Sequence, residues 1–157
     1  MSFSLHRVQA MVNIIRADIS HLDTVITLFN AYRSFYGKEV ADSDARSFLR
    51  ERIGKDESVI FLAELDSQPA GFTQLYPIFS SVNMSRVWLL NDLYVADFAR
   101  LHGVATALLQ AATGHASQTG ASGLVLQTGR DNRNARALYE REGWCRQDNY
   151  YWYDLEV

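Results

Sequence analysis

Three segments of strand-like sequence follow one another in the middle of the chain, and helix-like sequence flanks them. The first two lie within residues 58–79 (SVIFLAELDSQPAGFTQLYPIF), where DSQP separates two β-rich runs and predicts a hairpin. The third, RVWLLNDLYV at residues 86–95, leads directly into a helical pattern. This order of elements predicts an α/β or α+β fold around a mixed sheet.

Hydrophobic spacing predicts the remaining elements. VNIIRADIS (12–20) alternates like a first strand, and Ser20 is expected to cap a helix that Gly37 interrupts. Its apolar positions follow helical spacing: Leu22, Val25, Ile26, Phe29 and Tyr32. Later helices are predicted over 43–53, with Phe48, Leu49 and Ile53 inward, over 103–117, and over 132–143, which Gly143 closes. GASGLVLQT (120–128) predicts a short buried strand, and the aromatic NYYWYDLEV (149–157) a last one.

Length and composition favour one domain over residues 12–157, preceded by an extension over residues 1–11. A net charge of -3 gives no support to nucleic-acid binding through a basic surface. No run approaches the roughly 20 apolar residues of a membrane span, so no membrane partner is expected. The single Cys145 excludes an internal disulfide and indicates a reducing, cytoplasmic location. The four histidines lack metal-ligand spacing, so no metal is expected.

The loop in VADFARLHGVATALL (95–109) joins the third strand to the helix that starts at Gly103. The first N–H groups of a helix lack internal partners, and the helix dipole favours an anion there. Gly103 and Ala105 let a ligand approach the backbone, Arg100 adds positive charge, and Thr106 could add a hydroxyl. These features suit phosphate oxygens. The alternative is that the glycine and arginine only shape a turn.

Two motifs in the right order carry a family resemblance. LNDLYVADFARLHGVATALL, followed by a strand and then DNRNARALYEREGW, resembles the Gcn5-related N-acetyltransferases (GNAT). The resemblance implies a single domain with a mostly antiparallel sheet, splayed in the middle and flanked by about four helices. It implies acetyl-CoA as co-substrate, with its pyrophosphate bound by the loop. The matching loop positions are Arg100, Leu101, His102, Gly103, Val104, Ala105 and Thr106; the family often has glycine where Ala105 stands.

The same resemblance assigns further cofactor contacts. Leu93, Tyr94 and Val95 are expected to bind the pantetheine arm through their backbone and to polarise the thioester carbonyl. Asn132 and Ala135 match the motif N-x-x-A-x-x-x-Y-x-x-x-G, in which the asparagine contacts the cofactor arm. The alternative interpretation of Leu93, Tyr94 and Val95 is plain packing, which is compatible with backbone contacts.

Tyr139 occupies the tyrosine of that motif, and the resemblance implies that it protonates the leaving thiolate. An attacking ammonium must also lose a proton, because only the free amine is nucleophilic. Asp92 is the best-placed carboxylate for this, and Asn91 could order a water that carries the proton away. The alternatives are that Tyr139 packs and that the polar pair Asn91–Asp92 marks a β-bulge.

The acceptor is expected to be a primary amine. GFTQLYPIFSS followed by WLLNDLYV is most like the branch of diamine (spermidine/spermine) acetyltransferases and related histone or small-amine enzymes, although Asn91 replaces one residue of the usual acidic pair. The residues expected to line the acceptor site, unless they only pack, are Tyr32, Tyr36, Glu39, Gln74 and Tyr76. Alternative functions are protein lysine or N-terminal acetylation and non-catalytic acyl-CoA binding. The aromatic C-terminal segment further predicts a homodimer.

Overall fold

The structure, a computed structural model, describes residues 11–157, which divide into two units on either side of Leu126. Within the first unit the strands are β1 (Val12–Arg16), β2 (Val59–Leu65), β3 (Gln68–Ser80), β4 (Ser85–Val95) and β5 (Gly123–Val125). Its α-helices are α1 (Leu22–Phe35), α2 (Asp42–Gly54) and α3 (Val104–Gln118), with short 3-10 turns η1 (Ile19–His21) and η2 (Asp97–Ala99). The second unit contains α4 (Arg133–Arg141).

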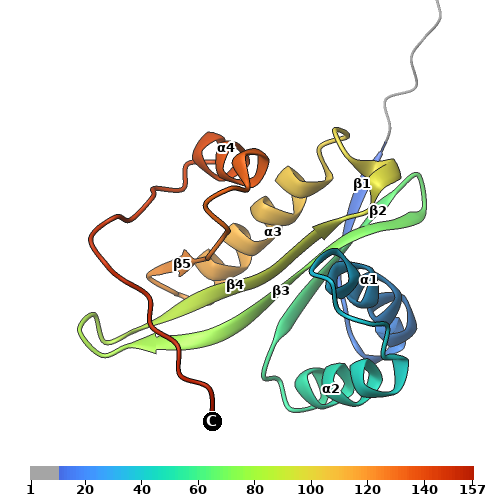
Figure 1. Cartoon of the computed structure of the whole chain (residues 1–157), viewed down its shortest axis with the longest axis horizontal. Helices are drawn as coiled ribbons and strands as arrows, with labels where there is room; N and C mark the ends of the chain where they lie inside the picture. The colour runs from blue at the N-terminus through green and yellow to red at the C-terminus, as the bar shows by residue number, and fades with distance from the viewer. Residues whose placement is uncertain (1–10) are drawn as a thin grey trace, which may run out of the picture. The chain divides into compact units, whose positions relative to one another are not determined.

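The five strands form one sheet in chain order (Figure 1). β1 to β4 pair antiparallel, whereas β5 pairs parallel to β4. Along β2 the alternation of side chains separates two layers: Ile60 and Leu62 pack in the core with α1 and α2, while the Phe61 ring meets His115 of α3. Helices therefore cover both faces of a mostly antiparallel sheet, as the sequence predicts.

The core between the sheet and helices α1 and α2 is made of aliphatic side chains with one aromatic ring, Phe72. Two expectations fail here. Ser20 does not cap the helix: it lies in the 3-10 turn η1, where the Asp18 carboxylate accepts from the Ser20 backbone N–H at 2.8 Å, and the N-cap of α1 is His21, which makes no side-chain cap. Phe48 is 38% exposed instead of inward, because its ring stacks on Phe29 at the rim of the core and lies under the Arg52 guanidinium.

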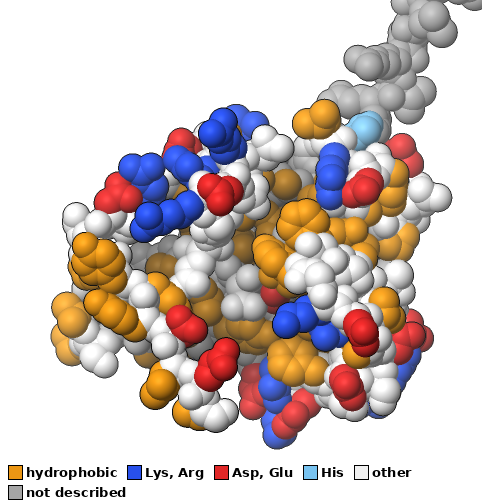
Figure 2. All heavy atoms as spheres, viewed as in Figure 1, with side chains coloured by type: hydrophobic (Ala, Val, Ile, Leu, Met, Phe, Trp, Pro, Cys, Tyr) orange, Lys and Arg blue, Asp and Glu red, His pale blue; other side chains and the backbone are white. Residues whose placement is uncertain are grey.

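The second unit, Gln127–Val157, is organised by α4. Asn132 caps the helix, since its side-chain oxygen accepts from the Ala135 backbone N–H at 3.2 Å. Gly143, with a φ of 88°, follows the helix end as predicted. Arginine side chains gather over α4 (Figure 2), which carries Arg133, Arg136 and Arg141.

The C-terminal segment after Trp144 forms neither helix nor strand, so the expectation of a last strand over 149–157 is wrong for this structure. A strand needs a hydrogen-bonded neighbour, and its own unit holds no other strand. The side chains of this segment are well exposed, among them Tyr150, Tyr151, Trp152 and Tyr153. Across residues 11–157, no helix has the length and apolar character needed to span a membrane.

Candidate active site

A β-bulge lies in the middle of β4. Gln74 pairs with Asp92, whereas the next residue of β3, Leu75, pairs with Leu90, so Asn91 is the extra residue. The polar pair of the sequence therefore marks a bulge, and this one exposes Asn91 while burying Asp92 to 5% exposure. Bulges re-aim side chains beside functional sites, so the bulge and a chemical role are compatible.

β4 has an open edge beyond its short pairing with β5. That pairing involves only Val87–Leu89 of β4, although β4 continues to Val95. On the other side, the Ala96 backbone N–H donates to the Ala70 carbonyl at 2.8 Å. By antiparallel alternation, the backbone groups of Leu93 and Val95 then point away from β3, toward the edge that β5 leaves open. The sheet is splayed here, as expected.

The Asp92 carboxyl is buried among neutral partners. The Asn91 side-chain amide donates to its Oδ1 at 3.1 Å, and the Tyr32 hydroxyl also hydrogen bonds to it. Burial nevertheless raises the pKa of Asp92 above its ordinary value of 3.8. The carboxyl therefore has a stronger affinity for a proton than an exposed aspartate has.

Four of the five expected acceptor residues lie around this carboxyl. Tyr32 interacts with both Asp92 and Tyr36, whose ring centroid lies 5.1 Å from that of Tyr32. Gln74 is fully buried opposite Asp92, and its amide donates to the Tyr76 hydroxyl. Burial, followed by the nearby negative charge of Asp92, raises the pKa of Tyr76 to about 12.

The fifth, Glu39, lies in the exposed loop between α1 and α2. Its backbone carbonyl accepts from Arg33. None of the described contacts joins Glu39 to the cluster formed by Asp92, Tyr32, Tyr36, Gln74 and Tyr76. Two further residues next to this cluster, Phe72 and Thr73, were not predicted from the sequence to lie at the site. Phe72 supports Tyr32 and Tyr94 with its ring, and the Thr73 hydroxyl donates to the Asp92 carbonyl at 2.8 Å. The alternation within GFTQLY is the signal that could have placed Phe72 on the same face as Gln74.

The loop before α3 ends in a glycine N-cap, which has no side chain with which to cap the helix. Gly103 is the N-cap of α3 with a φ of 81° and makes no side-chain cap, so the helix begins at Val104 rather than at Gly103. Leu101 also has a positive φ, 63°, and its side chain is fully exposed. Arg100 is held by an ion pair with Asp97 at 2.7 Å, and His102 Nδ1 lies 2.7 Å from the Arg100 carbonyl.

This loop fits a diphosphate. A Cβ placed on Gly103 would meet no atom within 4 Å, so open space lies over the first turn of α3. The amides of Val104 and Ala105 belong to that uncapped turn, where the helix dipole favours negative charge. The residues present are therefore suited to the pyrophosphate of coenzyme A.

In the second unit, Tyr139 lies on α4 two turns after the cap residue Asn132. Its ring centroid is 6.1 Å from that of Trp144, and its carbonyl accepts from the Trp144 backbone N–H at 2.9 Å. Tyr139 is partly exposed, so the packing by Trp144 fixes the ring without burying it. The Asn132 side-chain oxygen is engaged in the helix cap, where it accepts from the Ala135 backbone N–H.

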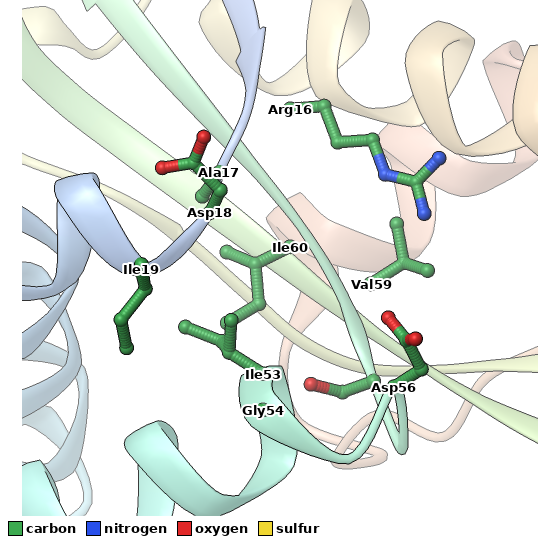
Figure 3. A pocket seen from close by; sticks show the side chains of 10 residues that line it. Arg16, Ala17, Asp18, Ile19, Ile53, Gly54, Asp56, Val59 and Ile60 are labelled. Carbon is green, nitrogen blue, oxygen red and sulfur yellow. The ribbon is translucent and has the colours of Figure 1, made fainter.

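A pocket of about 360 Å³ opens elsewhere, where the end of β1 and the start of β2 meet the C-terminal end of α2 (Figure 3). Its lining includes Arg16, Asp18, Asp56 and Ser58. None of the expected site residues lines this pocket. The expected site residues instead gather along β4, which the bulge and the open edge distinguish.

A family model described as "Acetyltransferase (GNAT) family" matches residues 25–144 of the chain. This range holds β4 with its bulge, the loop before α3 and the five residues expected at the acceptor site. The chain belongs to the acetyltransferase (GNAT) family. It is therefore an N-acetyltransferase of the GNAT type that uses acetyl-CoA, and the fold expected from the sequence is confirmed.

Individual relatives agree with this membership. The uncharacterized N-acetyltransferase YhfO of Bacillus subtilis is 44% identical over 146 residues, which cover 93% of this chain and 98% of YhfO. The crystal structure of a probable acetyltransferase is 41% identical with a TM-score of 0.87, covering 92% of this chain and 97% of that one. The aminoglycoside N-acetyltransferase AAC(6')-Iy in complex with CoA has a TM-score of 0.80 over 94% of this chain and 97% of its own; at 19% identity it shares the GNAT fold.

Among residues 11–157, no three His, Cys, Asp or Glu side chains gather where they could hold a metal ion. Of the three histidines in this range, His115 is buried between the Trp88 and Phe61 rings, His102 is exposed, and His21 Nδ1 lies 2.9 Å from the Asp18 carboxylate. His6 lies outside the described residues, as does most of the expected extension over residues 1–11.

Proposed function

We propose that this GNAT enzyme acetylates a primary amine of a small molecule, such as an amine, a polyamine or an amino acid, by direct attack in a ternary complex. The observation that carries the proposal is the buried Asp92 carboxyl on the β4 bulge, beside the open edge of the same strand. A carboxyl with raised proton affinity next to aromatic side chains suits an alkylammonium that must lose a proton.

Acetyl-CoA supplies the activated thioester. In the proposal, the loop Arg100–Thr106 holds its diphosphate through backbone N–H groups and the Arg100 charge. The backbone of Leu93–Val95, in which Leu93 and Val95 face the edge of β4 that β5 does not pair, hydrogen bonds the pantetheine arm and stabilises negative charge on the thioester oxygen. Asn132 and Ala135 are proposed to contact the cofactor arm as well.

Within the ternary complex, Asp92 accepts the proton of the attacking ammonium, directly or through a water ordered by Asn91. Tyr139 donates a proton to the departing thiolate; a phenol with an ordinary pKa of about 10 can do this for a nearby thiolate. No covalent acetyl-enzyme is needed. The single cysteine, Cys145, is exposed after α4 and has no place in this scheme.

The acceptor is proposed to sit against Tyr32, Tyr36, Gln74 and Tyr76, with Glu39 as an outer carboxylate. The resemblance to the diamine and histone branch supports an amine with an aliphatic body. Because Asn91 stands where that branch has an acid, one ammonium group is matched by Asp92 and a second ammonium close to it would find no carboxylate at position 91. A single primary amine is therefore favoured over a strongly polycationic substrate.

Two alternative functions can be tested by the same experiments. A protein lysine or N-terminal amine would present the same nucleophile on a larger body. A non-catalytic acyl-CoA binding module would retain the loop before α3 and need neither Asp92 nor Tyr139. We further propose one acetyltransferase domain over residues 12–157, a homodimer associated through the exposed aromatic C-terminal segment, and a cytoplasmic location.

The decisive experiment incubates the enzyme with acetyl-CoA and a panel of amines while free thiol is detected. The panel contains monoamines, diamines, amino acids and lysine peptides. Thiol release with a small amine supports the proposal, and release only with peptides favours protein acetylation. Coenzyme A binding by calorimetry with no thiol release by any amine would favour the binding module.

A further inference from the structure

Tyr32, one of the residues proposed to contact the acceptor, is held between two other aromatic rings. Its ring meets the buried ring of Phe72 edge-on, with centroids 5.9 Å apart, and meets Tyr36 at 5.1 Å on the other side. Phe72 pairs with Tyr94 across the β3–β4 ladder. Tyr94 lies two residues after Asp92 on β4, so the two side chains are on the same face of the sheet. Phe72 therefore fixes the Tyr32 ring at a level of β4 from which its hydroxyl reaches Asp92.

The Asp92 carboxyl has only two hydrogen-bond donors among the described residues, Tyr32 and Asn91. They differ in how firmly they are held. Asn91 is exposed at the bulge, whereas Tyr32 is partly buried between two aromatic rings on a long helix. The Tyr32 hydroxyl is thus the better-anchored donor.

The other groups around the carboxyl do not replace Tyr32. From β3, Gln74 directs its amide to the Tyr76 hydroxyl, and Tyr76 is a neutral phenol. From α2, Arg52 acts electrostatically on Tyr76, but its guanidinium is engaged by Glu51 at 2.9 Å and Glu57 at 2.6 Å. No cation therefore pairs with Asp92 in the described part of the chain.

We propose that Tyr32 is a positioning residue, whose hydroxyl orients the Asp92 carboxyl and stabilises its ionised form. This inference rests on the proposed function, in which Asp92 accepts the proton of the acceptor ammonium. A base must be ionised before it can accept a proton, and burial disfavours the ionised state. A hydroxyl that donates to the carboxylate opposes that effect without adding charge to the site.

The first test measures the carboxyl itself, in the absence of substrate. Side-chain carboxyl ¹³C resonances are titrated by NMR in the wild type, in Tyr32→Phe and in Asp92→Asn, which assigns the Asp92 signal. Loss of a hydrogen bond to a charged group is expected to raise the Asp92 pKa by about one pH unit. Tyr36→Phe is the matched control, because its hydroxyl lies next to Tyr32 and the expected change in the Asp92 pKa is smaller.

The second test is the pH dependence of kcat/KM with an amine found in the panel. In Tyr32→Phe the acidic limb is expected to move to higher pH by the same amount as the NMR midpoint, so activity recovers as pH rises. A uniform loss at every pH with an unchanged Asp92 titration would overturn the inference and make Tyr32 an ordinary packing or acceptor-binding residue. Equal displacements of the limb in Tyr32→Phe and Tyr36→Phe would overturn it too, because they indicate general loosening.

The two tests also separate this inference from the proposed function. If Asp92→Asn keeps the wild-type acidic limb, Asp92 is not the base and the proposed role fails. The NMR titration would still show whether Tyr32 controls the carboxyl. Circular dichroism melting of each variant checks that the fold is retained.

Discussion

Gln74 lies directly opposite Asp92 across β3 and β4, so the two buried side chains share one face of the sheet at the bulge. Gln74 is neutral and points its amide at Tyr76, so β3 offers the carboxylate no compensating charge. This pairing explains why burial dominates the proton affinity of Asp92. Asp92 is therefore a buried carboxyl without a charged partner on the face of the sheet that α1 covers, among the described residues.

Replacing Asp92 with asparagine should separate catalysis from stability. Loss of a general base is expected to lower kcat by about 10²- to 10⁴-fold.

The same variant tests the stability of the fold. The raised pKa of Asp92 means that its carboxyl stabilises the fold when protonated, and this contribution is lost as pH rises through the folded pKa. Asp92→Asn should therefore unfold at a higher urea concentration than the wild type near neutral pH. The gain is about 1.4 kcal/mol for each pH unit that separates the folded pKa of Asp92 from its unfolded value. Lower stability of the variant at that pH would contradict the buried-carboxyl argument.

Tyr139→Phe should lower kcat by at least about tenfold while the Kd for coenzyme A changes little, because only a proton donor is removed. Stopped-flow thiol release and calorimetry measure the two quantities. Tyr151→Phe, in the exposed C-terminal segment of the same unit, is the control for hydroxyl loss. Unchanged turnover in Tyr139→Phe would remove its role as an acid.

Two glycine-to-alanine changes at α3 should have opposite signs. Gly103→Ala forces alanine into a φ of 81°, which costs about 1 kcal/mol of unfolding free energy even though a Cβ fits there. Gly114→Ala, inside the same helix with no close neighbour to its Cβ, should add about 0.5–1 kcal/mol. Chemical denaturation measures both. Only Gly103→Ala should also weaken coenzyme A binding, and equal affinities in the two variants would argue against the loop as the diphosphate site.

His115 should make the fold sensitive to acid. It is 7% exposed between Trp88 and Phe61, and burial, followed by Arg16 and Arg86, lowers its pKa below 6.5. A lowered pKa means that stability is complete above about 6.5 and declines as pH falls toward the folded pKa. His115→Leu should lose less stability than the wild type between about pH 7.5 and pH 5 in urea unfolding. Parallel losses in both proteins would place the acid sensitivity elsewhere.

The aromatic C-terminal segment should control association. Removing residues 149–157 eliminates the exposed rings of Tyr150, Tyr151, Trp152 and Tyr153. Light scattering is expected to give a dimer mass for the full chain and a monomer mass for the shortened one. A monomeric full chain would count against the proposed homodimer.

The helices and strands of the first unit were largely predictable, because each carries its own periodicity. The hairpin around DSQP became β2 and β3, joined at Asp66 and Ser67, which both have positive φ. The last segment was not predictable in the same way. β-propensity states only that a strand is possible, and a strand forms where a neighbour supplies hydrogen bonds.

The element order, the loop before α3 and the family could be inferred from the amino-acid sequence, because these depend on local spacing and on residues adjacent in the chain. Which side chains meet across the sheet could be learned only from the three-dimensional fold. Tyr32 and Asp92 are sixty residues apart in the numbering, and a bulge of one residue selects whether Asn91 or Asp92 faces α1. Side-chain direction in a strand reverses with every residue, so the register of β3 against β4 sets which carboxyl or amide is buried.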